Sequence, residues 1–275
     1  MIAYLDTSAF GHIYSKTGCS GADIAQLRKA IYGRALSIRL SLHTLEEILL
    51  VPKASPQALA AQTKLTLSLA NSRTLIKPCA QLLRDDVQAY VIRGEADRPF
   101  LRGDMQNAVS AGIAALIESD GEELEDEFIE VLQESRQQKQ AFLALLERIS
   151  KAAPFNSDAA SNRSFEQYFE QAAASALELV ADYAGAGAAC RRRGLNGLLQ
   201  IKSVQMSLLS ALRSSNNPPY PTPPGSIHHA VSAAAVAAIF VCEDAPTRQL
   251  HSLSNDLEII TLSELLKRVS EDYAM

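Results

Sequence analysis

Residues 2–8 read IAYLDTS, a short apolar run that ends in three polar residues. A run of this length, bounded by polar residues, is typical of a buried strand that stops at a polar loop. Because an unpaired carboxylate is strongly disfavoured in an apolar core, we expect Asp6 at the end of this strand. The stretch therefore predicts a buried strand with an acidic side chain at its carboxyl end.

Strands and helices alternate in the residues that follow. A helical pattern covers about 23–36, residues 36–41 alternate apolar and polar side chains with period two, and a helix opens at Thr44. An Ala- and Leu-rich helix over about 55–70 leads to a candidate third strand at 74–77. This order indicates successive strand and helix units, which are typical of a parallel sheet.

Strand signals disappear between about residues 94 and 215. The composition there becomes Ala, Leu, Glu and Gln with helical spacing, interrupted by Gly, Ser, Asn and Pro. We expect an all-helical block whose helices cover about 104–118, 122–151, 164–184 and 191–213.

The α/β pattern returns after a proline-rich segment at 214–225, because prolines remove backbone donors and hold an extended chain. A helix at 226–235, an apolar strand at 238–242 and a last strand at 257–260 with its helix follow. We therefore expect an α/β fold with a parallel sheet flanked by helices. Its core would be formed by residues 1–92 plus 225–275, with a helical insertion at 93–213 and a connector at 214–225.

Composition indicates an ordinary soluble protein able to bury a sizeable core, with 47% hydrophobic and 21% charged residues in a chain of 275. No apolar run approaches the roughly 20 residues of a membrane-spanning helix, and the chain starts without a basic leader. The four cysteines are scattered and match no zinc-binding or disulfide pattern. We therefore expect a cytoplasmic protein without a membrane partner.

A formal net charge of -5 argues against binding nucleic acid chiefly by bulk electrostatic attraction. Any nucleic-acid contact is expected to be local. The clearest basic cluster is Arg191–Arg193, followed by Lys202 and Arg213. It is either a solvated helix face or a ridge that contacts phosphates.

Acidic side chains follow two of the expected strands. Asp6 and Asp244 would lie at the carboxyl ends of parallel strands, where such sheets bind their ligands. Crowded carboxylates repel one another unless a cation neutralises them, and Mg²⁺ or Mn²⁺ prefers oxygen ligands. Simpler roles remain open, since Asp6 could cap a helix, Thr44 and Glu47 could form a capping box, and Asp244 could start a turn.

Several of these segments resemble the PIN-domain nuclease family. Residues 5–8 are similar to its first strand and loop, and Ser41 with residues 44–49 is similar to its second motif, a helix that carries an acidic ligand. Residues 227–230 and 240–244 are similar to its later helix and strand, and residues 257–265 to its usual ending. The resemblance favours Glu47 over Glu46 as the acidic ligand.

The resemblance implies a metal-dependent endoribonuclease that hydrolyses phosphodiesters in single-stranded RNA. Asp6, Glu47 and Asp244 would be metal ligands for Mg²⁺ or Mn²⁺, and Ser8 would orient a ligand or water. One residue departs from the family pattern. Gly225 stands where the family usually has an aspartate three residues before a histidine, so the acid is either lost or replaced, with Glu243 and Asp104 as candidates.

The alternative is a PIN-like scaffold with a weakened site that binds RNA or a protein without cleavage. The helical insertion would then serve as a partner or homo-oligomer surface, whereas in a nuclease it would act as a lid, a substrate selector or a dimerising surface. His228 and His229 are adjacent on the expected helix, and adjacent helical residues point about 100° apart. At most one of them is expected to face the pocket, and structural roles are favoured for both.

Overall fold

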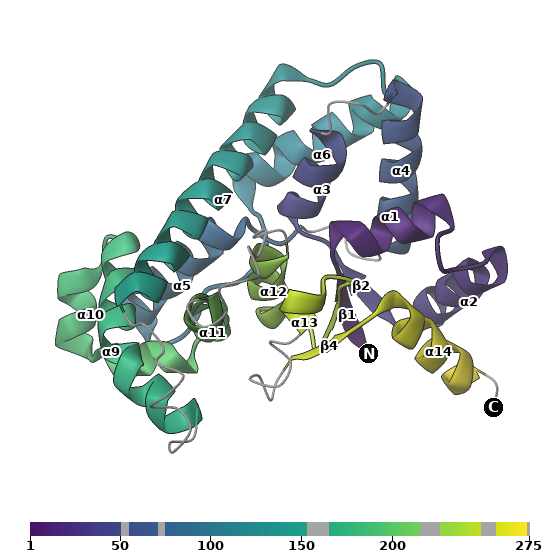
Figure 1. The fold of residues 1–275 in the computed structure, drawn as a ribbon. Coiled ribbons are helices and arrows are strands. Elements are labelled where there is room, and N and C mark those ends of the chain that lie inside the picture. Colours follow the sequence, from purple (N-terminus) through teal and green to yellow (C-terminus); the bar gives the residue numbers. More distant parts are fainter. Residues whose placement is uncertain (51–54, 71–74, 153–164, 215–225, 249–256, 274–275) are drawn as a thin grey trace.

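The computed structural model describes residues 1–50, 55–70, 75–152, 165–214, 226–248 and 257–273. They contain a four-stranded, all-parallel sheet flanked by helices (Figure 1). Its order is β2-β1-β3-β4, with the strands β1 at Ile2–Leu5, β2 at Ser37–Arg39, β3 at Ile239–Val241 and β4 at Glu258–Ile260. The expected mixed α/β fold with a parallel sheet is confirmed.

Strand β1 joins the two ends of the chain in one sheet. Ala3 pairs with Ile38 on one side and with Ile239 on the other. Successive side chains of β1 point to opposite faces, so Tyr4 enters one apolar cluster while Ala3 and Leu5 enter the other. Both faces of the sheet are therefore buried, as is usual for parallel sheets.

Five helices follow in the first part of the chain: α1 at Thr7–Ser15, α2 at Gly21–Tyr32, α3 at Leu42–Leu49, α4 at Pro56–Leu69 and α5 at Cys79–Arg93. The expected polar loop after β1 is wrong, because α1 starts directly at Thr7. The expected third strand is wrong for the part described, since Ile76 forms only isolated bridges, to Ser41 and Phe100.

The middle of the chain is helical as expected, with α6 at Gly103–Glu118, α7 at Asp126–Ala152, α9 at Phe165–Tyr183, α10 at Gly187–Arg193, the short 3-10 helix η1 at Leu195–Gln200 and α11 at Lys202–Ser214. A single helix over 191–213 is wrong. Gly194 has a φ of 106°, which L side chains rarely adopt, and it ends α10 before η1 begins.

The last part of the chain adds α12 at Ile227–Ala234, α13 at Ala245–Arg248 and α14 at Leu262–Tyr273. The expected proline-rich connector at 214–225 lies outside the described residues, apart from Ser214 at the end of α11. Among the helices described, none combines the length and the apolar character needed to cross a membrane.

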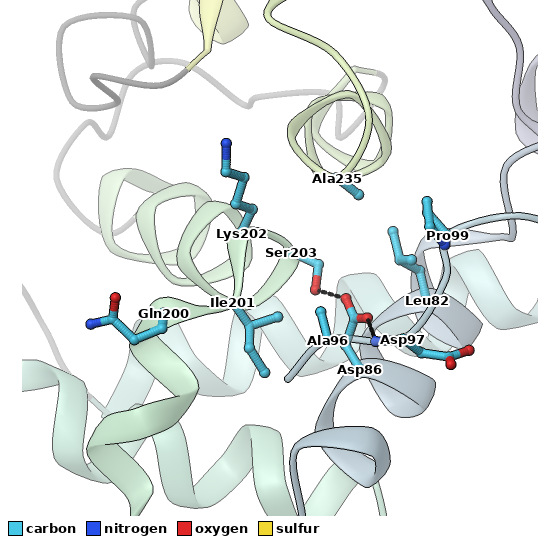
Figure 2. Close-up of a pocket in the computed structure, with 10 residues that line it drawn as sticks. All are labelled: Leu82, Asp86, Ala96, Asp97, Pro99, Gln200, Ile201, Lys202, Ser203 and Ala235. Carbon is cyan, nitrogen blue, oxygen red and sulfur yellow. Dashed lines mark hydrogen bonds between the residues drawn. The ribbon is translucent and has the colours of Figure 1, made fainter. Parts of the chain in front are cut away.

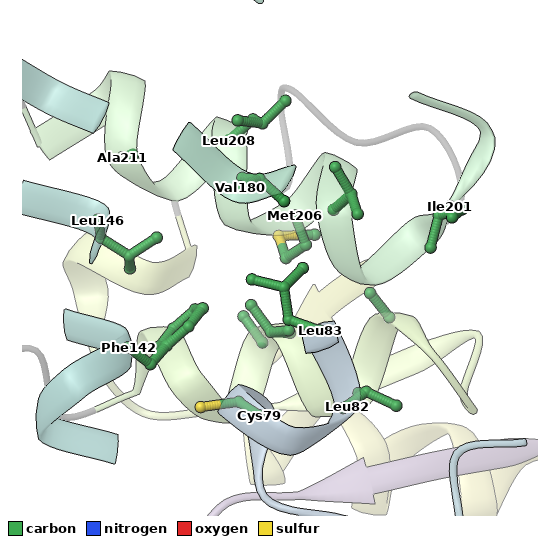
Figure 3. Packing of buried hydrophobic residues seen from close by; sticks show 14 of the residues in the cluster. Cys79, Leu82, Leu83, Phe142, Leu146, Val180, Ile201, Met206, Leu208 and Ala211 are labelled. Atoms are coloured by element: carbon green, nitrogen blue, oxygen red, sulfur yellow. The ribbon is translucent and has the colours of Figure 1, made fainter. Parts of the chain in front are cut away.

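Helices of the insertion share one apolar core with helices of the sheet region. Helix α7 packs against α3 and α5, and α11 packs against α7 and α12. Figure 3 shows how their side chains interdigitate: Leu83 of α5, Phe142 and Leu146 of α7, Val180 of α9 and Leu208 of α11. Burying one such side chain contributes about 1.5–3 kcal/mol. This packing fixes α7 against the helices that cover the sheet.

Candidate functional site

Glu47 lies on α3, at the carboxyl edge of the sheet. This helix begins earlier than the sequence pattern predicted, because Ser41 and not Thr44 is its N-cap, and the Ser41 hydroxyl accepts from the Thr44 N–H. The capping box of Thr44 and Glu47, which the sequence left open as an alternative, is therefore absent. The Glu47 side chain instead accepts a hydrogen bond from Thr7 Oγ1, at 2.5 Å. Its carboxylate is consequently free of helix capping and reaches toward α12.

His228 and His229 both contact this carboxylate. His228 Nε2 lies 2.9 Å from Glu47 Oε1, and His229 Nε2 lies 3.0 Å from Glu47 Oε2. The expectation that at most one histidine faces the pocket is wrong. The two rings lean together, with centroids 4.2 Å apart, so their long side chains converge although their Cα–Cβ bonds diverge. The two parts of the site are 181 and 182 positions apart in the chain.

Glu47, His228 and His229 form a compact group of potential metal ligands. One ligand atom from each lies within 4.8 Å of the other two. In the part of the chain that the structure describes, this is the one such group of three histidine, cysteine or acidic residues. Two imidazoles and a carboxylate are also the protein ligands of some catalytic zinc sites.

Tyr4 contacts the His229 ring at Nδ1, the nitrogen that does not contact Glu47. Its hydroxyl lies 2.6 Å from His229 Nδ1 and 2.6 Å from the Ser41 hydroxyl, and the Tyr4 side chain is fully buried. Burial raises the pKa of the Tyr4 hydroxyl far above its usual value, although its hydrogen bonds to Ser41 and Thr44 oppose this shift. Tyr4 therefore stays protonated and can either donate to His229 or accept from it.

Lys139 reaches the site from α7 of the insertion. Its ammonium lies 3.0 Å from Glu47 Oε1 and 3.1 Å from Glu46 Oε1. The Glu46 carboxylate also contacts His43 Nδ1 and Arg136, each at 3.2 Å. One ammonium thus serves two neighbouring carboxylates, of which only Glu47 belongs to the ligand group.

The charges of the site follow from these contacts. Burial raises the pKa of the Glu47 carboxyl, but the electrostatic interaction with His229 and the hydrogen bonds with His228 and His229 lower it more strongly. The net shift is well below the usual range, so Glu47 is ionised. Burial, together with the neighbouring His229, lowers the pKa of His228 to about 3, although Glu47 opposes the shift. His228 is therefore neutral at physiological pH.

Asp6 is buried at the end of β1 and caps α1. Its Oδ1 accepts from the Ser8 hydroxyl at 2.7 Å and from the Ala9 N–H at 2.8 Å. Its Oδ2 accepts from the Ser226 hydroxyl in a longer contact of 3.4 Å. Ser8 therefore orients Asp6, and the capping role that the sequence left open is present.

Asp244 follows β3 and caps α13. Its Oδ2 accepts from the N–H of Thr247 at 3.0 Å and from the Thr247 hydroxyl at 2.5 Å. Strands β1 and β3 are neighbours, and the Asp6 N–H donates to the Val241 carbonyl, so Asp6 and Asp244 follow the same edge of the sheet. They do not join Glu47 in a compact ligand group among the described residues.

The two candidate replacement acids lie elsewhere. Glu243 Oε1 accepts from the Leu262 N–H and so caps α14. Asp104 is exposed in the first turn of α6. Gly225 is outside the described residues, but its neighbour Ser226 is the residue that contacts Asp6.

The basic cluster is partly engaged in contacts within the protein. Arg191 lies 3.7 Å from Asp182. Arg193 donates to the Val91 carbonyl and lies over the Tyr90 ring. All three arginines are exposed, and a phosphate-contacting ridge remains a prediction.

A second polar group lies in a pocket of about 160 Å³ between α5, the segment that follows it, and α11 (Figure 2). Asp86 accepts hydrogen bonds there from the Ser203 hydroxyl and from the Asp97 N–H. Burial raises the pKa of Asp86 to about 6, although both hydrogen bonds oppose the shift. The hydrogen bond from Ser203 to Asp86 links α11 of the insertion to α5. This pocket is separate from the Glu47 group.

The fold and the site together define an α/β protein whose parallel sheet carries a carboxylate and two imidazoles near its carboxyl edge. Comparison with protein-family models, curated proteins and solved structures gave no significant match. The adjacent His228 and His229 were the sequence signal for the nitrogen ligands. Nothing local in the sequence pointed to Lys139 or to the hydroxyl of Tyr4.

Proposed function

We propose that the protein is a PIN-type, divalent-metal-dependent phosphodiester hydrolase that acts on single-stranded RNA. The observation that carries this proposal is the meeting of Glu47 with His228 and His229, residues from opposite ends of the chain. They meet near the edge where Asp6 and Asp244 follow neighbouring strands. Ligands of open α/β sheets bind outside the carboxyl ends of the strands, which is where these groups lie.

A divalent cation bound at Glu47 would polarise a phosphodiester and lower the pKa of a water molecule, which makes that water a nucleophile. The chain's own residues prepare this edge. Ser8 and the Ala9 N–H fix one oxygen of Asp6, and the other oxygen has a longer contact with the Ser226 hydroxyl. Asp6 is therefore held as an oriented acceptor for a water or for an ion ligand.

A second function, an RNA- or protein-binding scaffold that does not cleave, is favoured by two observations. Lys139 already neutralises Glu47 without a metal ion. In addition, the place three residues before His229 is Ser226, so counting from this histidine also finds no acid where the resemblance implies one. A hydroxyl in place of a carboxylate would weaken cation binding at Asp6.

Cleavage of a mixed-sequence single-stranded RNA, with Mn²⁺ or Mg²⁺ and with EDTA, tests the proposal. We expect cleavage that EDTA abolishes and that Glu47→Gln reduces about 100-fold or more, because a metal ligand is lost. Asp6→Asn is informative because asparagine also caps helices, so α1 should persist while activity falls.

Asp104→Asn, which changes an exposed acid outside the group, is the matched control and should cleave like the wild type. RNA that binds but stays intact in every metal would favour the scaffold function. Cleavage that survives in Glu47→Gln would contradict the proposed hydrolase, in which Glu47 binds the metal ion.

A further inference from the structure

We propose that Glu47, His228 and His229 bind one borderline transition-metal ion of the Zn²⁺ class in preference to Mg²⁺, and that this ion displaces Lys139 from Glu47. The inference deepens the proposed function, on which it rests only for the reaction the ion would serve. The metal preference follows from the contacts of Glu47 with His228 and His229. The counter-ion role follows from the contact of Glu47 with Lys139.

The donor atoms determine the class of ion. Two of the three ligands are imidazole nitrogens, which suit Zn²⁺, Fe²⁺, Co²⁺ and Ni²⁺, whereas Mg²⁺ demands oxygen ligands in octahedral geometry. Both histidine side chains are 1% exposed, so water has little access from their side. The Glu47 side chain is 24% exposed, which leaves an open side for a water or substrate ligand. Three protein ligands and an open position are typical of catalytic zinc sites.

The distances of the two imidazole nitrogens from Glu47 are close to those between ligands of one ion. In a tetrahedral site with bonds near 2.1 Å, neighbouring ligand atoms lie about 3.4 Å apart. Here each Nε2 lies 2.9 or 3.0 Å from a Glu47 oxygen. Small side-chain rotations, with no movement of α3 or α12, would therefore open room for the ion between the three groups.

Tyr4 supplies the support that a metal-bound histidine needs. When His229 Nε2 binds an ion, its proton must reside on Nδ1, and the Tyr4 hydroxyl is 2.6 Å from that atom. Tyr4 would then accept from Nδ1 and donate to the Ser41 hydroxyl, also at 2.6 Å. Such an outer partner fixes both the tautomer and the ring orientation.

Lys139 has a second carboxylate available when the ion arrives. Its ammonium already lies 3.1 Å from Glu46 Oε1, so it can leave Glu47 and keep a partner. A cation this close to a bound dication repels it, and the repulsion lowers metal affinity. Helix α7 of the insertion would thus set how tightly the site holds its metal.

The test is calorimetric titration of Zn²⁺ and Mg²⁺ into the metal-free full chain, with Co²⁺ absorption as an independent readout of ligand geometry. We expect one Zn²⁺ per chain, no comparable Mg²⁺ binding, and tetrahedral-type Co²⁺ bands. His228→Gln and His229→Gln should each weaken Zn²⁺ binding more than about 100-fold, since loss of an outer-shell partner alone costs about 10–100-fold.

The role of Lys139 is tested by one variant, Lys139→Met, and by two matched controls, Arg136→Met and His12→Gln. Lys139→Met should tighten Zn²⁺ binding at least about 10-fold, because the repelling charge is removed. Arg136→Met should leave it unchanged, since Arg136 contacts Glu46 and the Leu50 carbonyl. His12→Gln, a histidine outside the group, should also bind Zn²⁺ like the wild type. Lys139→Met keeps all three ligands, so it remains informative if the buried histidine variants fail to fold.

Equal Zn²⁺ affinity in wild type and Glu47→Gln, or no Zn²⁺ binding by folded Lys139→Met, would overturn the inference. Equal affinity in Lys139→Met and wild type would remove the counter-ion role. Zn²⁺ binding without RNA cleavage would sink the hydrolase but keep the site. Mg²⁺-dependent cleavage by a wild type that binds no Zn²⁺ would overturn the site but keep the hydrolase.

Discussion

The ammonium of Lys139 lies 3.0 Å from the carboxylate of Glu47, although 92 positions separate the two residues. Lys139 belongs to the helical insertion, and Glu47 belongs to a helix that follows the second strand of the sheet. The insertion therefore completes the electrostatic environment of the candidate site. Its helices also share an apolar core with α5 (Figure 3).

Replacing Lys139 by methionine should destabilise the metal-free protein and not the metal-loaded one. Loss of a hydrogen bond between charged groups costs about 1.5–3 kcal/mol, and Lys139 is only 16% exposed. Urea unfolding in EDTA should show this loss, and an excess of Zn²⁺ should offset it. Arg136→Met should cost less than about 1 kcal/mol, because that side chain is 45% exposed. Identical behaviour of the two variants would contradict the assigned role of Lys139.

Replacing Tyr4 by phenylalanine should lower the free energy of unfolding by about 1–3 kcal/mol. The change leaves His229 Nδ1 and the Ser41 hydroxyl without their shared partner in a buried place. Thermal or urea unfolding would measure the loss. Tyr14→Phe is the control, since Tyr14 is 39% exposed, and it should unfold like the wild type. A Tyr4→Phe protein as stable as the control would show that the hydroxyl is dispensable.

Asp86 should make stability depend on pH in the acidic range. The pKa of Asp86 is about 6 in the folded protein, compared with 3.8 for an aspartate without these contacts. Burial is the main cause, because it disfavours the charged carboxylate. The folded state therefore holds the proton more tightly, and the stability this contributes is present below pH 3.8 and is lost as the pH rises through about 6. The change is on the order of 3 kcal/mol.

Asp86→Asn should remove this dependence, because asparagine does not titrate. Relative to the wild type, the variant should gain stability as the pH rises from acidic to neutral values, which urea unfolding at a series of pH values would show. Asp104→Asn, at an exposed acid, should keep the wild-type slope. A wild-type slope in Asp86→Asn would assign the titration to another group.

Gly112 on α6 is packed so closely that alanine should destabilise the protein. A Cβ there would lie 2.3 Å from the Phe128 ring, which is buried between α6 and α7. Overpacking costs about 1–3 kcal/mol and exceeds the gain in helix propensity of about 1 kcal/mol. Gly11→Ala on α1 meets nothing within 4 Å and should instead stabilise slightly. Thermal unfolding of both variants checks the pair, and stabilisation by Gly112→Ala would be the contrary result.

Much of the fold could be predicted from local patterns. The apolar runs ahead of Asp6 and Asp244 did become neighbouring strands, and the Ala- and Leu-rich middle did become helices. The errors lie at boundaries, where a single residue decides. Ser41 starts a helix before Thr44 does, and the positive φ of Gly194 divides a helix that composition alone would continue.

The candidate site could be predicted only in part. Glu47 was chosen for its place in a motif, and it is the carboxylate of the ligand group. The two histidines were set aside because helical geometry separates adjacent Cβ directions, yet their long side chains converge on one group. Asp6 and Asp244 lie at the expected edge, where each caps a helix.

Local chemistry thus set the strands, the helices and the positions of the acids, because hydrophobic period and capping depend on near neighbours along the chain. The contacts within the site were decided only by the tertiary structure. Tyr4 lies 225 positions before His229, and Lys139 lies 92 positions after Glu47. Contacts over such separations leave no periodic trace in a sequence, since they depend on how whole helices pack against the sheet.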